Sequence, residues 1–201
     1  MRVLLTGFDP FGGESVNPSY EAARLVRAPA GVELTVAEIP TVFGESLSIL
    51  NKELRSSRPD AVLLLGQAAG RRALTPERIA VNCEDARIPD NAGCAPQDVP
   101  VIPGAPAAYF STLPIRRMTE AIRAAGVPAE ISNTAGTFVC NALMFGLLHT
   151  LATEYPGVRG GFLHVPCIPE QAGRMPEGTF TLPLPEIARG LEAAIRAIAE
   201  S

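Results

Sequence analysis

The chain is organised around residues 131–145, which read Ile131-Ser-Asn-Thr-Ala-Gly-Thr-Phe-Val-Cys140-Asn-Ala-Leu-Met-Phe145. Small residues lead to a thiol, and the apolar run that follows predicts a buried helix to about Thr153. Cys140 would then lie at a helix N-terminus, where free backbone N–H groups and the helix dipole favour the thiolate, the reactive form of cysteine. Free cysteines are usually small buried hydrophobes, so position alone leaves both a catalytic and a structural Cys140 open.

The residues before this stretch alternate between strand and helix patterns. Continuous apolar runs are typical of strands buried in a parallel sheet, and an apolar–polar alternation is typical of a half-covered strand. Asn17-Pro18-Ser19 predicts a helix start, because Asn caps helices and Pro is tolerated in the first turn. We expect strands at 2–6, 32–39 and 59–65, and helices from about 18 to 26 and from 43 to 54.

An irregular stretch follows before the alternation resumes. We expect a loop from residue 66 into a strand near 79–81, and then a long Pro- and Gly-rich loop through 83–112, with turns at 85–93. A loop of this length is usually functional or mobile. Thr112 is expected to cap a helix that Gly126 and Pro128 end. The remaining expected elements are a short strand at 129–132, a buried strand at 160–166 and a C-terminal helix with an inward stripe of Ile187, Leu191, Ile195 and Ile198.

This order of elements predicts the α/β class. We expect residues 1–201 to form a single domain, a three-layer α/β/α sandwich around a mainly parallel, twisted sheet. A chain of this length can bury a substantial core without metal ions or disulfides. In such sheets, functional sites lie at the carboxyl ends of the strands.

The composition excludes several classes of function. A net charge of -4 gives no basic stripe for nucleic acid. No apolar stretch approaches the roughly 20 residues that cross a membrane. The first residues run straight into a strand without the flanks of a signal peptide, so we expect a cytoplasmic protein. Its four cysteines would be reduced there, and two histidines argue against a structural zinc site.

A cysteine nucleophile needs a base, most often a histidine that a third group holds in place. His149 lies nine residues after Cys140 on the same expected helix and so points to about the opposite side. His164 ends an apolar strand at the same sheet edge as the loop before Cys140, although a structural strand-end histidine is the commoner case. Glu77 is the most suggestive acid to orient His164. A surface acid paired with Arg72 or Arg78 is the alternative for Glu77.

Five motifs stand in order along nearly the entire chain. They are Thr6-Gly-Phe8-Asp-Pro-Phe11-Gly-Gly13 with Asn17-Pro18-Ser19, Gly66-Gln67-Ala-Ala69 with Leu74-Thr-Pro-Glu77-Arg-Ile-Ala-Val-Asn82, Asp85-Ala-Arg87-Ile-Pro-Asp-Asn91, Ser132-Asn-Thr-Ala-Gly-Thr-Phe-Val-Cys140-Asn141, and Gly161-Phe-Leu-His164-Val-Pro166 with Pro169-Glu-Gln171. Together they resemble the pyroglutamyl peptidase I family, also called pyrrolidone-carboxylate peptidases, which are cysteine peptidases. The resemblance implies a catalytic domain that removes N-terminal pyroglutamate from peptides through a thioester intermediate.

The resemblance also implies roles for individual residues. Cys140 would be the nucleophile, His164 the general base and acid, and Glu77 the residue that orients His164. The pocket for the lactam ring would be lined by Phe8, Phe11 and Val139, with Gln67 and Arg87 in polar substrate contacts or oxyanion support. No cofactor and no metal are implied. The partners would be peptides with N-terminal pyroglutamate and further copies of the chain in a tetramer or dimer.

Other functions stay open at this point. Another cysteine amidase or transferase on a similar fold would lack a lactam-sized pocket between Phe8 and Phe11. A non-catalytic small-molecule binding protein is disfavoured because all three candidate catalytic residues are present. An activity like that of nucleoside phosphorylases needs a phosphate site, and the loop at residues 7–13 matches no phosphate-binding motif.

Overall fold

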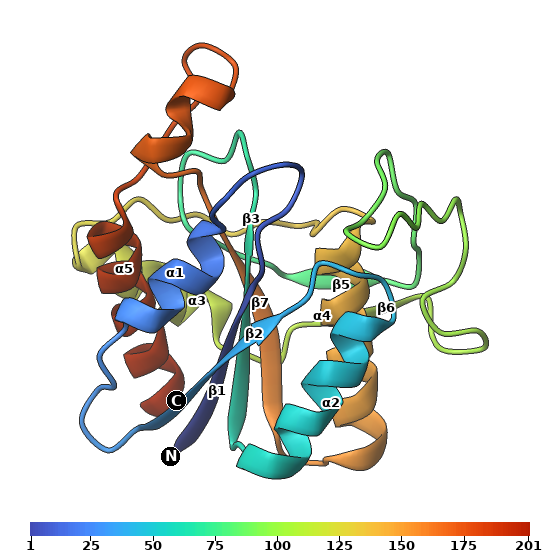
Figure 1. Cartoon of the computed structure of the whole chain (residues 1–201). Helices are drawn as coiled ribbons and strands as arrows, with labels where there is room; N and C mark the ends of the chain where they lie inside the picture. Colours follow the sequence, from blue (N-terminus) through green and yellow to red (C-terminus); the bar gives the residue numbers. More distant parts are fainter.

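The computed structural model describes residues 1–201 and contains a five-stranded sheet with helices on both faces (Figure 1). The strands lie in the order β2-β1-β3-β7-β4. Four of them run parallel, namely β1 (Arg2–Phe8), β2 (Glu33–Ile39), β3 (Ala61–Gln67) and β7 (Arg159–Val165). The short β4 (Thr75–Pro76) is antiparallel to β7. The predicted α/β class with a mainly parallel sheet is confirmed.

Two helical layers cover this sheet (Figure 1). One layer contains α1 (Pro18–Leu25), α3 (Ile115–Ala124) and α5 (Leu184–Ala199), and the other contains α2 (Glu45–Ser57) and α4 (Val139–Glu154). The division follows the alternation of side chains along the strands. In β1, Val3 and Leu5 pack toward the first layer, whereas Leu4 and Phe8 pack toward the second. The predicted α/β/α sandwich is therefore confirmed.

The predicted strands agree with the burial of the observed ones. β3 and β7 lie inside the sheet and are buried along almost their whole length, as their continuous apolar runs predict. β2 is an edge strand whose side chains are mostly half-buried, in agreement with its alternating sequence. No helix is both long and apolar enough to span a bilayer.

Three local expectations need correction. Thr112 does not cap α3, because its hydroxyl instead accepts a hydrogen bond from the backbone N–H of Gly160 in β7 at 2.8 Å. The strand expected at 129–132 is reduced to two isolated bridges, since β4 takes the edge of the sheet beside β7. The stretch 83–112 is not a loop throughout. It includes β6 (Ala108–Phe110), which pairs antiparallel with β5 (Ile79–Val81).

Candidate active site

Cys140 lies in the first turn of α4, as the sequence predicts. The helix begins at Val139, so Cys140 is its second residue. The fully buried Asn141 fixes this turn to β5. Its Oδ1 accepts from the N–H of Val81, and its Nδ2 donates to the carbonyl oxygens of Val81 and Cys83, each at 2.9 Å. The position of the thiol is therefore set by a polar anchor in the next residue.

Cys140 and His164 lie on the same face of the sheet, at the carboxyl ends of β3 and β7. Gly66 in β3 is the register partner of His164 in β7, so both positions point to one face. A Cβ atom on Gly66 would lie 2.9 Å from Sγ of Cys140. The ring of Phe162 belongs to the same face, with its centroid 4.7 Å from that of His164. The thiol of Cys140 and the imidazole of His164 therefore both lie on this face of the sheet, near Gly66 at the end of β3.

Glu77 holds the ring of His164. Nδ1 of His164 lies 2.7 Å from Oε1 of Glu77, and both side chains are buried. With Nδ1 engaged by the carboxylate, Nε2 is the ring nitrogen left for proton transfer. Nη2 of Arg71 lies 3.1 Å from the same Oε1 atom, whereas Oε2 has no hydrogen-bond partner. Glu77 is therefore not a surface acid, and its arginine partner is Arg71 and not Arg72 or Arg78.

The thiol of Cys140 is protonated in the resting site. Burial raises its pKa to about 12, and the negative charge of Glu77 adds to the shift. The expectation that the helix start would favour the thiolate is wrong here, because desolvation of the anion outweighs the backbone N–H groups of the first turn. Cys140 keeps partial exposure to solvent. Its reaction as a nucleophile requires a neighbouring base to take the proton.

A cavity of about 370 Å³ opens beside Cys140. Phe8, Phe11 and Gln67, three of the predicted substrate residues, line it. Phe138 adds a further aromatic wall, with its ring centroid 5.3 Å from that of Phe11. The size and the aromatic lining suit a small, flat and largely apolar group.

The amide of Gln67 is held from behind by two side chains. Its Nε2 atom donates to Oε1 of Gln171 at 3.1 Å and to Sγ of Cys167 at 3.2 Å. Gln171 is buried and also accepts from the N–H of Ile168 through the same Oε1 atom. All four cysteines are free, and Cys167 is the buried one. It therefore packs behind Gln67 without forming a disulfide.

Two predicted substrate residues lie outside the cavity lining. Arg87 is exposed, and its neighbour Ile88 lines the cavity instead. Val139 is fully buried among apolar residues of the α2 and α4 layer. His149, which the sequence placed away from the thiol, accepts or donates a 2.9 Å hydrogen bond with the hydroxyl of Tyr109.

The sequence interpretation missed several cavity residues. Phe138 and Ile88 stand inside motifs that were recognised, so their apolar character next to Cys140 and Arg87 was an available signal. Arg174 and Met175 come from the end of the short helix η1 (Pro169–Arg174), and no periodicity marks that segment. Arg174 lies 3.7 Å from Glu14 across the cavity rim, a pairing between distant segments that only the fold reveals.

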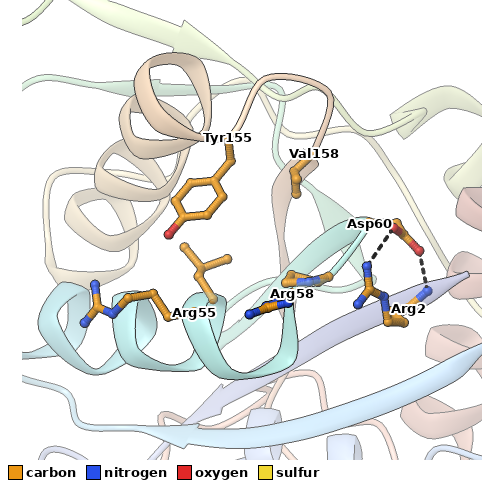
Figure 2. Close-up of a pocket in the computed structure, with 8 residues that line it drawn as sticks. Arg2, Arg55, Arg58, Asp60, Tyr155 and Val158 are labelled. Carbon is orange, nitrogen blue, oxygen red and sulfur yellow. Dashed lines mark hydrogen bonds and ion pairs between the residues drawn. The ribbon is translucent and has the colours of Figure 1, made fainter.

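A second and larger cavity, of about 610 Å³, lies at the opposite end of the sheet. Figure 2 shows its arginine side chains and the pairing of Arg2 with Asp60 across 3.6 Å. Its lining contains no cysteine, whereas Cys140 lines the smaller cavity, with the His164–Glu77 pair outside that lining. No group of three or more His, Cys, Asp or Glu side chains is arranged to hold a metal ion.

Comparisons with known proteins show the family of this chain. A family model described as pyroglutamyl peptidase matches residues 1–201. The chain is 58% identical to a pyrrolidone-carboxylate peptidase of Streptomyces coelicolor, covering 100% of this chain and 93% of the relative. It is 53% identical to a pyrrolidone-carboxylate peptidase of Levilactobacillus brevis, covering 98% and 97%. The crystal structure of pyroglutamyl peptidase I from Bacillus amyloliquefaciens superposes with a TM-score of 0.96 at 46% identity, covering 100% and 97%.

Proposed function

The chain belongs to the pyroglutamyl peptidase family, and from that premise we propose that Cys140, His164 and Glu77 carry its catalysis. The family's activity is removal of N-terminal pyroglutamate from peptides by a cysteine-peptidase mechanism, and this chain is an enzyme of that class. The observation that carries the residue assignment is the placement of Cys140 Sγ and of His164 beside Gly66 on one face of the sheet, with the imidazole hydrogen-bonded to a buried carboxylate.

In the proposed reaction, His164 takes the proton of Cys140 as the sulfur attacks. Because burial raises the pKa of the thiol, the sulfur needs a base to take its proton before or as it bonds to the carbonyl carbon. The carbonyl that is attacked joins pyroglutamate to the next residue. Glu77 stabilises the imidazolium that forms and keeps Nε2 turned toward the sulfur.

The tetrahedral intermediate carries a negative charge on the former carbonyl oxygen. Backbone N–H groups in the first turn of α4 lack intrahelical partners and can donate to this oxygen. The intermediate collapses when the C–N bond breaks and His164 gives its proton to the departing amine. A thioester between Cys140 and pyroglutamate remains. Water then attacks the thioester carbonyl while His164 takes a proton from the water. The C–S bond breaks, His164 returns the proton to the sulfur of Cys140, and pyroglutamate leaves.

We propose that the lactam ring enters the cavity between Phe8, Phe11 and Phe138. A five-membered lactam is small, uncharged and nearly flat, so aromatic walls and a few directed hydrogen bonds suit it. Gln67 is the polar wall of the cavity, and Gln171 fixes its orientation. We expect no role for the exposed Arg87 in holding the ring itself, and Val139 supports the cavity by packing behind Cys140.

Substrate selectivity tests this function. The protein is mixed separately with pyroglutamyl, prolyl and alanyl amides of an aminocoumarin, and the fluorophore release is measured. We expect release from the pyroglutamyl compound alone. Proline differs from pyroglutamate by a charged secondary amine in place of the lactam amide. Desolvation of that charge between aromatic walls is costly, and Glu14, the one acid in the lining, already pairs with Arg174 and Gln171. Equal release from the prolyl compound would contradict the assignment of the cavity.

We also propose that residues 1–201 work as one catalytic domain in the cytoplasm, as a homo-oligomer of two or four copies. Four free thiols are compatible with a reducing compartment. Val99 and Phe110 are large exposed hydrophobic residues within the stretch 83–112, which favours this stretch as a contact between copies. Light scattering after gel filtration tests the assembly, and a mass of a single 21.2 kDa chain at micromolar concentration would contradict it.

A further inference from the structure

Arg71 contacts both halves of the proposed catalytic apparatus. Its Nη2 atom lies 3.1 Å from Oε1 of Glu77, the oxygen that also holds His164. The same Nη2 atom donates to the carbonyl oxygen of Thr134 at 3.1 Å. Thr134 belongs to the loop that leads into α4 and Cys140. One guanidinium group therefore links the acid that orients the base to the segment that presents the nucleophile.

The positive charge of Arg71 stabilises the buried carboxylate of Glu77. Glu77 has no exposed surface, and its Oε2 atom has no hydrogen-bond partner. A carboxylate in this position needs a nearby positive charge to stay ionised. Either the guanidinium of Arg71 or a protonated His164 can supply it. Three ionisable groups surround the His164–Glu77 pair or its acid. They are Glu77 itself, from the turn after β4, Cys140 from α4, and Arg71 behind Glu77.

We propose that Arg71 is a positioning residue that balances the charge of Glu77, so that His164 stays a neutral base ready to accept the thiol proton. The proposal rests on the catalytic roles proposed above for Glu77 and His164. Without Arg71, the buried carboxylate would hold a proton on the imidazole instead. A base that is already protonated cannot take the proton of Cys140, so the enzyme would lose activity at neutral pH.

Replacement of Arg71 by Met tests this role through a pH profile. We expect the acidic limb of kcat/KM for a pyroglutamyl coumarin amide to move to higher pH by roughly one unit, since the lost charge is close to the pair. The loss of activity should approach roughly tenfold on the acidic limb and become small near pH 9. Arg71→Lys retains the charge, so its acidic limb should stay within about 0.3 unit of the wild-type position.

Arg72→Met is the matched control. Arg72 is the neighbouring arginine, is exposed, and places its guanidinium 6.0 Å from the ring centroid of Phe180, away from Glu77. Its profile should equal that of the wild type. If Arg71→Met does not fold, Arg71→Gln, which removes the charge and keeps an amide donor, takes its place. Circular dichroism and the unfolding temperature establish the fold of each variant.

A folded Arg71→Met protein whose acidic limb is unmoved, or moves to lower pH, would overturn the proposal. A fall in kcat at all pH values with no movement of the limb would also overturn it, because that result describes a structural link without control of the base. Failure of the proposed function gives a different result, since the wild-type protein itself would then not cleave the pyroglutamyl amide, or Cys140→Ser would cleave it.

Discussion

Sγ of Cys140 lies 2.9 Å from the position that a Cβ atom on Gly66 would occupy. The same Cβ would meet the ring of Phe162 at 2.7 Å. Both distances are shorter than van der Waals contact, so glycine at the end of β3 leaves the room that the Cys140 sulfur and the Phe162 ring occupy, beside the register position of His164. Gly66 therefore lies where strand β3, the first turn of α4 and the strand that carries His164 come together.

Gly66→Ala is therefore expected to displace the thiol from its base. A shift of about 1 Å in a reacting atom can cost roughly 100-fold in rate, and we expect a loss of that size in kcat/KM for the pyroglutamyl amide. Gly173→Ala is the control, because a Cβ there meets nothing within 4 Å. A Gly66→Ala protein with wild-type activity would show that the thiol does not react from this position.

Glu77→Gln should separate the orientation of His164 from the packing around it. The amide has the shape of the carboxylate but cannot stabilise an imidazolium, and its Nε2 group can turn the ring to the wrong tautomer. We expect kcat to fall by roughly 100-fold or more while the fold is kept. The measurement is steady-state turnover beside Glu130→Gln, an exposed glutamate. Equal kcat values for the two variants would remove Glu77 from the mechanism.

The pKa of Cys140 predicts how stability depends on pH. In the folded protein burial raises it to about 12 from the ordinary value of 9.0, so above pH 9 the unfolded chain loses a proton that the native protein keeps. The free energy of unfolding therefore falls as pH rises above about 9. Below pH 9 the stability that the protonated Cys140 thiol contributes is fully present. Between pH 8.5 and 10.5, wild-type protein should lose about 1 to 2 kcal/mol more than Cys140→Ser.

Urea unfolding of the two proteins at both pH values, under reducing conditions, measures this difference. Serine does not ionise in this range, so it removes the titration and keeps nearly the same size. The same loss of stability in both proteins would mean that the thiol of Cys140 is not desolvated in the native state.

Asn141→Ala should destabilise the protein. The Asn141 side chain is fully buried and makes three hydrogen bonds to the backbone of Val81 and Cys83. Truncation leaves these backbone groups unpaired beside a void, and we expect a loss of about 2 to 4 kcal/mol in the free energy of unfolding. Asn133→Ala, at an exposed asparagine that pairs with Arg78, should cost less than about 1 kcal/mol. Denaturant titration compares them, and equal losses would contradict the anchoring role.

Much of the fold was predictable because its signals are local. The apolar runs that became β3 and β7 and the thiol-bearing apolar helix α4 follow from periodicity and helix-start rules. The assignment of Thr112 as a helix cap was wrong. A hydroxyl before a helix can accept from the helix N–H groups or from another strand, and here it accepts from the N–H of Gly160. β6 was missed because three residues in a Pro- and Gly-rich stretch carry no recognisable alternation.

The site was less predictable than the fold. The sequence predicted Cys140 and His164 at the same edge of the sheet. The placement of His164 beside Gly66 depends on the register between β3 and β7, which no local pattern fixes. The raised pKa of the thiol depends on burial by the fold and on the charge of Glu77, which is distant from Cys140 in the sequence. Arg71 was not distinguished from Arg72, because two adjacent arginines look alike until the fold turns one of them toward the carboxylate.

Partial alkylation with mapping of the modified cysteine tests the central claim most directly. Iodoacetamide is added at pH 7.5, and peptide mass spectrometry measures the modification of Cys83, Cys94, Cys140 and Cys167 while the remaining cleavage of a pyroglutamyl coumarin amide is recorded. We predict that the fraction of activity lost equals the fraction of Cys140 modified, whatever the state of the other three thiols. Protein fully alkylated at Cys140 that still cleaves the substrate would contradict the account.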